Sequence, residues 1–333
     1  GDAGAFLALQ APANLPLPAN SLRVDDLLVV APDPLARQLL HQQLRVRRRS
    51  PRGLALRCVQ QLRQGQAVAW NAAAVGQLFG ALAPLAEDLE QGCLQLNSQG
   101  TVLRWQGEAD ASEGSLAPQP APLSAPDDQR LPDGLWLDLR GRTLDLLLRG
   151  LLNSPLLRQS LAQTYGLGPG PLRLLQAMPF QLRLQPLDRG PFRADLQLQL
   201  EVGQGRTVIN AWLADLSAAL TQQGLSPSQP AAGVTAWSRE DGAPAGGWRW
   251  LPGGTDLLLF LGPVPTRLLP SEPLGEASWR LRLLPQAMAR AGLLPVVLHS
   301  VERLSGHLSL AGRSAGVRSG ERQSSLIGQL DLR

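Results

Sequence analysis

The sequence predicts an α+β fold in which repeated strand–helix–hairpin units build mainly antiparallel sheets, with helices packed on one face. Three observations carry this prediction. Several short segments alternate apolar and polar residues at a period of two, which is typical of half-buried strands. Between them lie longer segments with apolar residues at helical spacing. The order of a tryptophan-bearing strand, a helix and a hairpin occurs in residues 66–108, 135–202 and 277–332.

The N-terminal region begins with two expected strands, at residues 4–10 and 21–30, which prolines separate. A helix is expected to follow over residues 33–44. Asp33 can cap its free amides, and Pro34 fits its first turn.

The densest positive charge in the chain follows this helix, and its side chains are Arg45, Arg47, Arg48 and Arg49. Such a cluster could bind phosphates, an anionic membrane surface or an acidic partner. The alternative is a solvated turn, favourably placed at a helix C-terminus.

The first unit has an expected strand at residues 67–70 and a helix from Asn71 to about residue 90, which Gly92 ends. A hairpin turning near residue 100 completes it. We therefore expect an N-terminal α+β domain over residues 1–108. The proline-rich segment 109–134 is the expected linker to a C-terminal α+β domain, residues 135–333, which contains the two other units.

The C-terminal domain is expected to contain many short elements. Its expected strands cover residues 135–140, 180–185, 192–201, 234–238, 248–251, 256–262, 279–283, 306–312 and 325–332. Its expected helices cover residues 143–152, 154–165, 172–178 and 207–223, and a last one begins at Pro285. The glycine string at residues 166–170 is interpreted as a helix break, since Pro169 lacks the amide that a bound phosphate would need.

The amino-acid composition excludes several classes of function. The chain has 333 residues, of which 44% are hydrophobic and 17% charged, so a sizeable core is expected. All 31 basic residues are arginines, which excludes Schiff-base and phosphate-loop lysines. The net charge of +4 is modest, and no aromatic residues flank the arginine cluster, so nucleic acid is not an expected partner.

No constellation typical of catalysis is evident. His41, His299 and His307 have no carboxylate or thiolate at ligand spacing, and we expect no metal site. There is no Gly-x-Ser-x-Gly motif, and adjacent carboxylates do not share a face of a helix or strand. Cys58 and Cys93 are interpreted as buried thiols, with a single disulfide between them left open. We therefore expect no enzyme, no catalytic residues and no cofactor.

Trp248 and Trp250 are the candidate ligand- or partner-binding aromatics. Alternation along a strand places both indoles on one sheet face, where they could hold an apolar ligand or a partner. The alternative is that both are core residues.

The stretch from Gly233 to Arg239, with Gly247–Trp250 and Leu257–Gly262, resembles a family of uncharacterised bacterial proteins that is common in cyanobacteria. The resemblance implies a membrane-anchored, extracytoplasmic protein, in the periplasm or thylakoid lumen, whose anchor precedes residue 1. Residues 305–312 and 328–332 are also similar to the edge strands of bacterial lipid-transport bridge proteins. The frequent helices disfavour that second fold.

Two hypotheses follow. The first is a non-enzymatic scaffold or assembly protein that binds a protein partner at or near a membrane surface. The alternative is a carrier of an apolar ligand, a lipid or pigment, in a pocket between helices and sheet. The sequence leaves the partner, the ligand and the oligomeric state open.

Overall fold

The computed structural model describes residues 7–10, 14, 16–24, 27–31, 34–35, 37–38, 42, 53–70, 89, 91–110, 130–152, 155–187, 193–265, 274, 277–294, 299–310 and 323–332. The chain divides into two compact units. Unit 1 comprises Gly1–Ala125 and Leu308–Gln329, and unit 2 comprises Pro126–His307 and Leu330–Arg333. Every strand pair with a defined register is antiparallel, so the α+β class predicted from sequence is confirmed.

Unit 1 has a small sheet in the order β1-β3-β2, made of β1 (Leu7–Gln10), β2 (Ser21–Val24) and β3 (Leu27–Val30). The single strand expected over residues 21–30 is wrong, because β2 and β3 pair with each other and Ser21 lies opposite Val30. The chain thus reverses its direction between Val24 and Leu27. The reversal makes β3 the central strand, which buries both Leu28 and Val29.

The described part of unit 1 also contains a helix and three further strands. They are α2 (Leu54–Gln64), β4 (Ala67–Trp70), β5 (Gln91–Gln99) and β6 (Val102–Asp110), and β16 (Gln323–Leu332) follows β6 in the sheet order. Helix α2 was not predicted from the sequence. Its Leu54 and Cys58, about one helical turn apart, pack against Cys93 of β5.

Gly92 does not end a helix, contrary to the prediction. It lies within β5 opposite Trp70, and a Cβ there would overlap the Trp70 indole. The indole Nε1 instead donates a hydrogen bond to the Leu89 carbonyl at 2.6 Å. The glycine is therefore needed for a close side-chain approach. The helix expected before it falls on residues 71–88, outside the described part of the chain.

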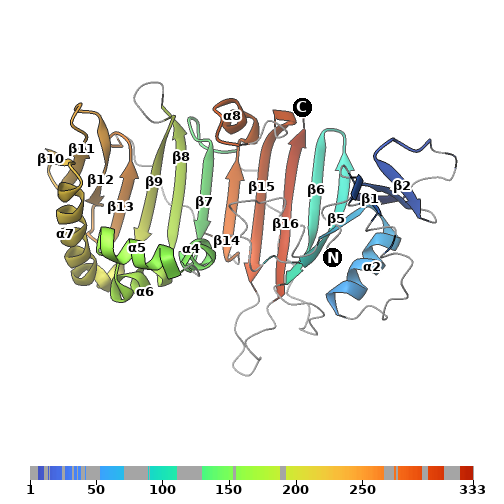
Figure 1. The fold of residues 1–333 in the computed structure, drawn as a ribbon, viewed down its shortest axis with the longest axis horizontal. Coiled ribbons are helices and arrows are strands. Elements are labelled where there is room, and N and C mark those ends of the chain that lie inside the picture. Colours follow the sequence, from blue (N-terminus) through green and yellow to red (C-terminus); the bar gives the residue numbers. More distant parts are fainter. Residues whose placement is uncertain are drawn as a thin grey trace. The chain divides into compact units, whose positions relative to one another are not determined.

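Unit 2 is built on one large antiparallel sheet (Figure 1). Its strands are β7 (Leu137–Gly141), β8 (Phe180–Pro186), β9 (Ala194–Glu201), β10 (Ser226–Ala231), β11 (Val234–Ser238), β12 (Pro244–Trp250), β13 (Asp256–Leu261) and β14 (Trp279–Leu283). They lie in the order β10-β11-β12-β13-β9-β8-β7-β14, and β15 (Val301–Leu310) follows β14. Both β15 and β16 have residues in each of the two units.

The register gives the unit 2 sheet two chemically different faces, because side chains alternate along each strand. One face, here called the leucine face, carries a row across six strands: Leu281, Leu139, Leu182, Leu198, Leu259 and Trp248. The other, here called the polar face, carries the row Arg282, Asp138, Arg183, Gln197 and Phe260. The alternating sequence thus separates leucines from arginines and glutamines across one sheet.

Several helices of unit 2 pack on the leucine face. They are α4 (Asp145–Leu152), α5 (Pro155–Tyr165), α6 (Pro169–Ala177) and α7 (Arg206–Gln222), which follows the short 3-10 turn Gly203–Gly205. Helix α8 (Pro285–Arg290) instead follows the end of β14. Helices α4 to α6 cross the lower part of β7 to β9, and α7 lies beside β10 (Figure 1). The core joins α7 to the sheet through Ile209, Trp212, Leu200 and Leu257.

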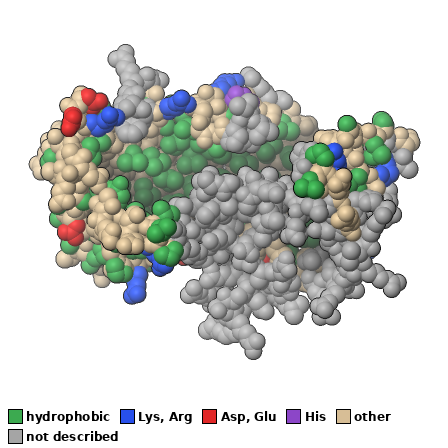
Figure 2. All heavy atoms as spheres, in the orientation of Figure 1, with side chains coloured by type: hydrophobic (Ala, Val, Ile, Leu, Met, Phe, Trp, Pro, Cys, Tyr) green, Lys and Arg blue, Asp and Glu red, His purple; other side chains and the backbone are tan. Residues whose placement is uncertain are grey.

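Part of the leucine face stays uncovered by these helices. Figure 2 shows a recessed surface of apolar side chains above α4 to α6. Leu137, Leu182, Leu198 and Leu281 are only half-buried, consistent with that opening.

Helix α6 begins earlier than the expected residues 172–178. Pro169 is its first residue and Gly168 precedes it. Proline suits the first turn of a helix because no intrahelical partner is lost there. Residues 166–168 of the glycine string therefore separate α5 from α6, and residues 169–170 already belong to α6.

Candidate functional site

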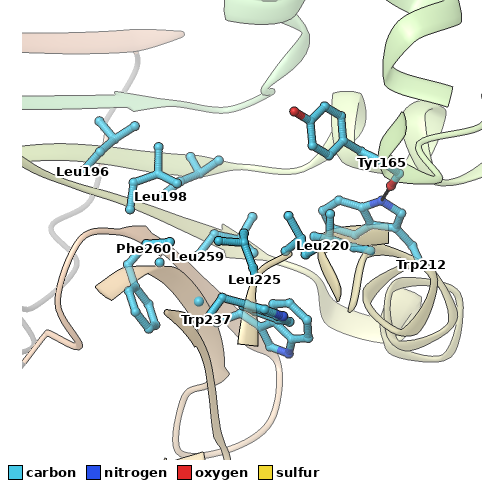
Figure 3. A pocket seen from close by; sticks show the side chains of 15 residues that line it. Tyr165, Leu196, Leu198, Trp212, Leu220, Leu225, Trp237, Leu259 and Phe260 are labelled. Atoms are coloured by element: carbon cyan, nitrogen blue, oxygen red, sulfur yellow. Dashed lines mark hydrogen bonds between the residues drawn. The ribbon is translucent and has the colours of Figure 1, made fainter. Parts of the chain in front are cut away.

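An apolar pocket of about 360 Å³ lies between α7 and the leucine face of unit 2 (Figure 3). The sheet contributes Leu196 and Leu198 from β9, Trp237 from β11, Ala245–Trp248 from β12 and Leu259–Leu261 from β13. The helical side contributes Tyr165, Trp212, Leu216, Leu220 and the adjoining Leu225. The volume is within the ~300–1,000 Å³ range of small-molecule pockets.

Helix α7 forms its wall of the pocket with one apolar stripe. Ile209, Trp212 and Leu213 are buried against the sheet, which fixes the helix. Leu216 and Leu220 continue the stripe at intervals of four residues but are only half-buried, so they face the pocket. The Trp212 indole donates a hydrogen bond to the Tyr165 carbonyl at 3.3 Å, which joins the end of α5 to this wall.

The two candidate tryptophans have different positions. Trp248 lines the pocket and stacks at a tilt on Trp237, with ring centroids 4.0 Å apart. Trp250 is not among the pocket residues. Its indole donates to Asn210 Oδ1 at 3.0 Å, and the Arg206 guanidinium lies 4.6 Å from its ring centroid. Trp250 therefore fastens the N-terminal part of α7 to β12.

The chemistry of the pocket wall is that of a hydrocarbon surface. Its residues are leucine, tryptophan, phenylalanine, alanine and glycine, with Tyr165 the one that carries a hydroxyl. No charged side chain is among them. Such a wall binds by removing apolar surface from water, and offers a ligand few oriented polar contacts.

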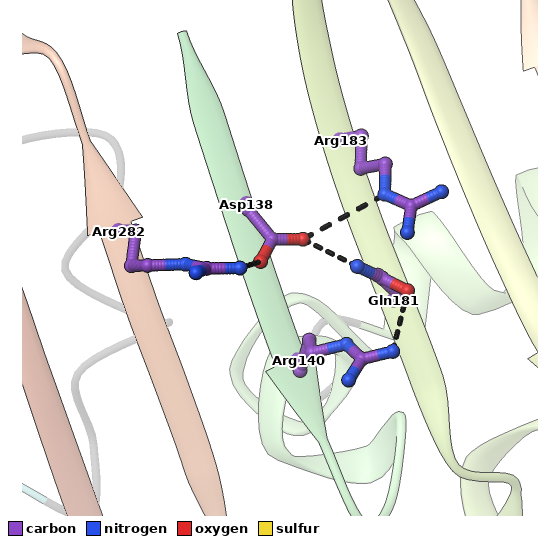
Figure 4. Close-up of polar contacts among 5 residues, drawn as sticks. All are labelled: Asp138, Arg140, Gln181, Arg183 and Arg282. Atoms are coloured by element: carbon purple, nitrogen blue, oxygen red, sulfur yellow. Dashed lines mark hydrogen bonds and ion pairs between the residues drawn. The ribbon is translucent and has the colours of Figure 1, made fainter. Parts of the chain in front are cut away.

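The polar face is a second candidate, and a buried network organises it (Figure 4). Asp138 accepts hydrogen bonds from Arg282 and Gln181, and its Oδ1 lies 3.7 Å from Nε of Arg183. Gln181 in turn accepts from Arg140 at 2.7 Å. These five side chains are all buried, and three neighbouring strands carry them. The network therefore holds β14, β7 and β8 in register.

Asp195 of β9 extends the polar face toward the edge of the network. Its Oδ2 accepts hydrogen bonds from Gln185 and Gln197, at 2.7 and 2.8 Å. Burial raises the pKa of this carboxyl above its ordinary value, and the two amide donors only partly offset the effect.

In unit 1 the candidate cysteines meet as free thiols. Cys58 of α2 and Cys93 of β5 are hydrogen-bonded to one another. This bond lowers the pKa of Cys58 and, together with burial, raises that of Cys93. The disulfide that the sequence left open is not formed in this structure.

Other candidates from the sequence are dispersed or lie outside the described residues. Arg45, Arg47, Arg48 and Arg49, like His41, fall in undescribed segments. His299 is exposed and His307 half-buried. Within the described ranges, no three His, Cys, Asp or Glu side chains gather as metal ligands would. Nor does any described helix have the length and apolar character needed to span a bilayer.

Of the pocket residues, Trp248 was a candidate from the sequence, whereas the rest of the pocket and the polar network were not predicted. Leu196 and Leu198 were assigned to a strand, and Leu216 and Leu220 to a helix, each correctly. No local sequence pattern indicated that the apolar side chains of this strand and this helix leave a space between them. For the polar face, the signal was present: arginine, aspartate and glutamine fill the alternate positions of residues 137–140, 181–184 and 280–283.

Comparison with known proteins adds no relative: no protein-family model, curated protein or solved structure matches this chain.

Proposed function

We propose that this chain binds an apolar ligand of the lipid or pigment class in the pocket between α7 and the sheet. The observation that carries the proposal is a cavity of about 360 Å³ in whose wall no described residue is charged. The wall continues through Leu196 and Leu198 into the uncovered leucine face. An elongated hydrocarbon chain suits this surface better than a compact polar molecule.

The free energy gained by burying apolar surface favours a ligand with a long hydrocarbon chain. Each buried methylene contributes about 0.8 kcal/mol, so roughly ten methylenes contribute about 8 kcal/mol. Association itself costs at least about 4 kcal/mol. A small apolar molecule would gain too little to bind firmly, whereas an acyl or isoprenoid chain would bind.

A substitution that fills the pocket tests the proposal. Leu220→Trp places a larger ring in the wall, and we expect it to weaken binding of a fluorescent long-chain fatty acid by at least about tenfold, or ~1.4 kcal/mol. Fluorescence titration measures the affinity. Native mass spectrometry of the unmodified protein should in addition detect a bound hydrocarbon-chain molecule.

Ala218→Trp is the matched control, because residue 218 is exposed on the same helix and does not line the pocket. It should leave the affinity unchanged. Equal affinities for the wild type and Leu220→Trp would contradict the proposal, as would an equal loss in both tryptophan variants.

The scaffold hypothesis remains a second proposal, and one observation favours it. Leu156 of α5 is 77% exposed beside the 47% exposed Leu157, and adjacent exposed leucines suit contact with a protein partner as well as with lipid. A stoichiometric partner recovered with the native protein would support it. The extracytoplasmic location, the anchor before residue 1, the absence of enzymatic activity and the cyanobacterial-type resemblance all stay predictions.

We also propose that the three strand–helix–hairpin segments are copies of one unit. Two features support this. Strands β7, β8 and β9 are neighbours in chain order, with α4 to α6 inserted after β7. Strands β4, β5 and β6 are likewise neighbours, and α8 follows β14. Superposition of the three segments in an experimental structure tests the duplication.

A further inference from the structure

Helix α5 lies at the surface along its whole length and exposes two adjacent leucines. None of its eleven residues is buried. Leu156 is 77% exposed, Leu157 47% and Tyr165 37%. Leu156 and Leu157 together form a small exposed apolar surface that can contact another apolar phase or a partner.

The charge around this helix favours one kind of occupant. The segments 155–165 and 169–177, which form α5 and α6, contain Arg158 and Arg173, both exposed, and no acidic residue. Figure 2 shows basic and apolar side chains together on this outer surface. Exposed leucines flanked by arginines match an anionic lipid bilayer, where leucines enter the interface and arginines meet the headgroups.

Two acidic side chains of the described part of the chain lie next to these helices. Asp145 of α4 accepts a hydrogen bond from Gln176 of α6 and is half-buried. Asp215 of α7 lies against Gly166, at the opposite end of α5 from Leu156. Leu156, Leu157 and Arg158 therefore lie together at the end of α5 that is distant from Asp215.

The opposite end of the same helix reaches the pocket. Tyr165, the last residue of α5, lines the cavity, and its carbonyl holds Trp212 of the pocket wall. Leu261, on the sheet side of the cavity, is 55% exposed. A hydrocarbon chain leaving a bilayer beside α5 would thus meet apolar side chains at the cavity entrance.

We propose that α5 docks unit 2 on an anionic bilayer so that its apolar ligand passes between membrane and pocket without crossing water. This inference rests on the proposed ligand-binding function and specifies where the ligand comes from. The occupant of the α5 surface is a lipid membrane, and Leu156, Leu157, Arg158 and Arg173 are its contacts.

Co-sedimentation of the whole chain with vesicles tests the docking. Vesicles of phosphatidylcholine alone are compared with vesicles that also contain phosphatidylglycerol. The double variant Leu156→Gln/Leu157→Gln should lower binding to the anionic vesicles by at least about tenfold, because two leucines leave the interface. Arg158→Gln/Arg173→Gln should lower it by roughly fivefold per arginine, and added salt should weaken the wild type in the same way.

Leu293→Gln is the matched control, since Leu293 is 40% exposed but follows α8 rather than lying on α5. It should bind vesicles like the wild type. Equal binding to neutral and anionic vesicles overturns the inference, and so does unchanged binding of the leucine double variant. Self-association that depends on the α5 leucines, with no vesicle binding, assigns the surface to a second copy and also overturns it.

Fatty-acid titration without vesicles separates this inference from the function on which it rests. Leu156→Gln/Leu157→Gln should keep the affinity for the fatty acid, and Leu220→Trp should keep vesicle binding while losing that affinity. Fatty-acid binding without vesicle docking overturns the docking alone. Vesicle docking without fatty-acid binding by the wild type overturns the ligand function and the transfer role with it.

Discussion

Two buried aspartates of the polar face have opposite electrostatic surroundings. Asp138 lies among arginines, with Arg282 donating to Oδ2 and Arg183 3.7 Å from Oδ1. Asp195 has only the neutral donors Gln185 and Gln197, both on Oδ2, and its Oδ1 makes no hydrogen bond. A charged carboxylate is therefore compensated at residue 138 and poorly compensated at residue 195.

Asp195→Asn should raise the midpoint temperature of unfolding at pH 7. The folded-state pKa of Asp195 lies above its ordinary value of 3.8, so the folded protein binds this proton more tightly than the unfolded chain. Stability is consequently lost as pH rises from 3.8 through the folded-state pKa. Asp195→Asn removes this loss of stability because asparagine does not ionise. Its carbonyl can still accept hydrogen bonds from both glutamines.

Thermal denaturation at neutral pH and again below pH 3.8 measures this effect. The gain should be present at pH 7 and vanish in acid, where the wild-type carboxyl is also neutral. Asp138→Asn serves as the contrast and should be destabilising at pH 7, because it leaves buried arginines without their counter-charge. A pH-independent gain for Asp195→Asn would refute the electrostatic explanation.

At the scale of single elements, local patterns determined what could be predicted. The β8–β9 hairpin and α7 were expected nearly at their observed bounds, since strict alternation and a five-residue apolar stripe are local signals. Strand β10 was missed because it contains two prolines and all its residues are exposed. Helix α2 was missed because arginines and glutamines occupy five of its eleven positions, which weakens the apolar pattern.

Gly92 shows a limit of element-scale prediction. A glycine after an expected helix suggests a C-terminal cap, but here the glycine lies inside β5 beneath Trp70. Only the cross-strand partner reveals its role, and strand pairing is not a local property. The pocket could not be predicted for the same reason. The strands and the helix that form its two walls were each predicted correctly, but no local pattern indicates that they lie opposite one another.

Gly92→Ala should destabilise unit 1 by about 1–3 kcal/mol, the usual cost of inserting a methyl into a packed site. The new Cβ would overlap the Trp70 indole and approach the Glu108 carbonyl. Hydrogen exchange in β4 and β5 measures the loss. Gly65→Ala is the control, because its backbone is extended and a Cβ there meets nothing within 4 Å. Equal protection in both variants would show that the indole moves aside freely.

At the scale of the whole molecule, the two units have separate cores and different candidate chemistry. The pocket residues all belong to unit 2, whereas Leu54, Cys58 and Cys93 form a core within unit 1. The sequence predicted an α+β chain with two α+β regions. It did not indicate that β15 and β16, distant from β6 in the chain, contribute residues to both units.

A saturating long-chain fatty acid should therefore protect one unit selectively from hydrogen exchange. At about one hundred times the dissociation constant, a ligand stabilises the state that binds it by roughly 2.7 kcal/mol. Amides that open only when the pocket opens should slow by up to about a hundredfold, and these lie in α7, β9, β11, β12 and β13. Amides of α2 and β4 to β6 should exchange as before. Uniform slowing of exchange across the chain would instead indicate that the ligand does not bind specifically in the pocket. Leu220→Trp should abolish the selective protection, whereas Ala218→Trp should retain it.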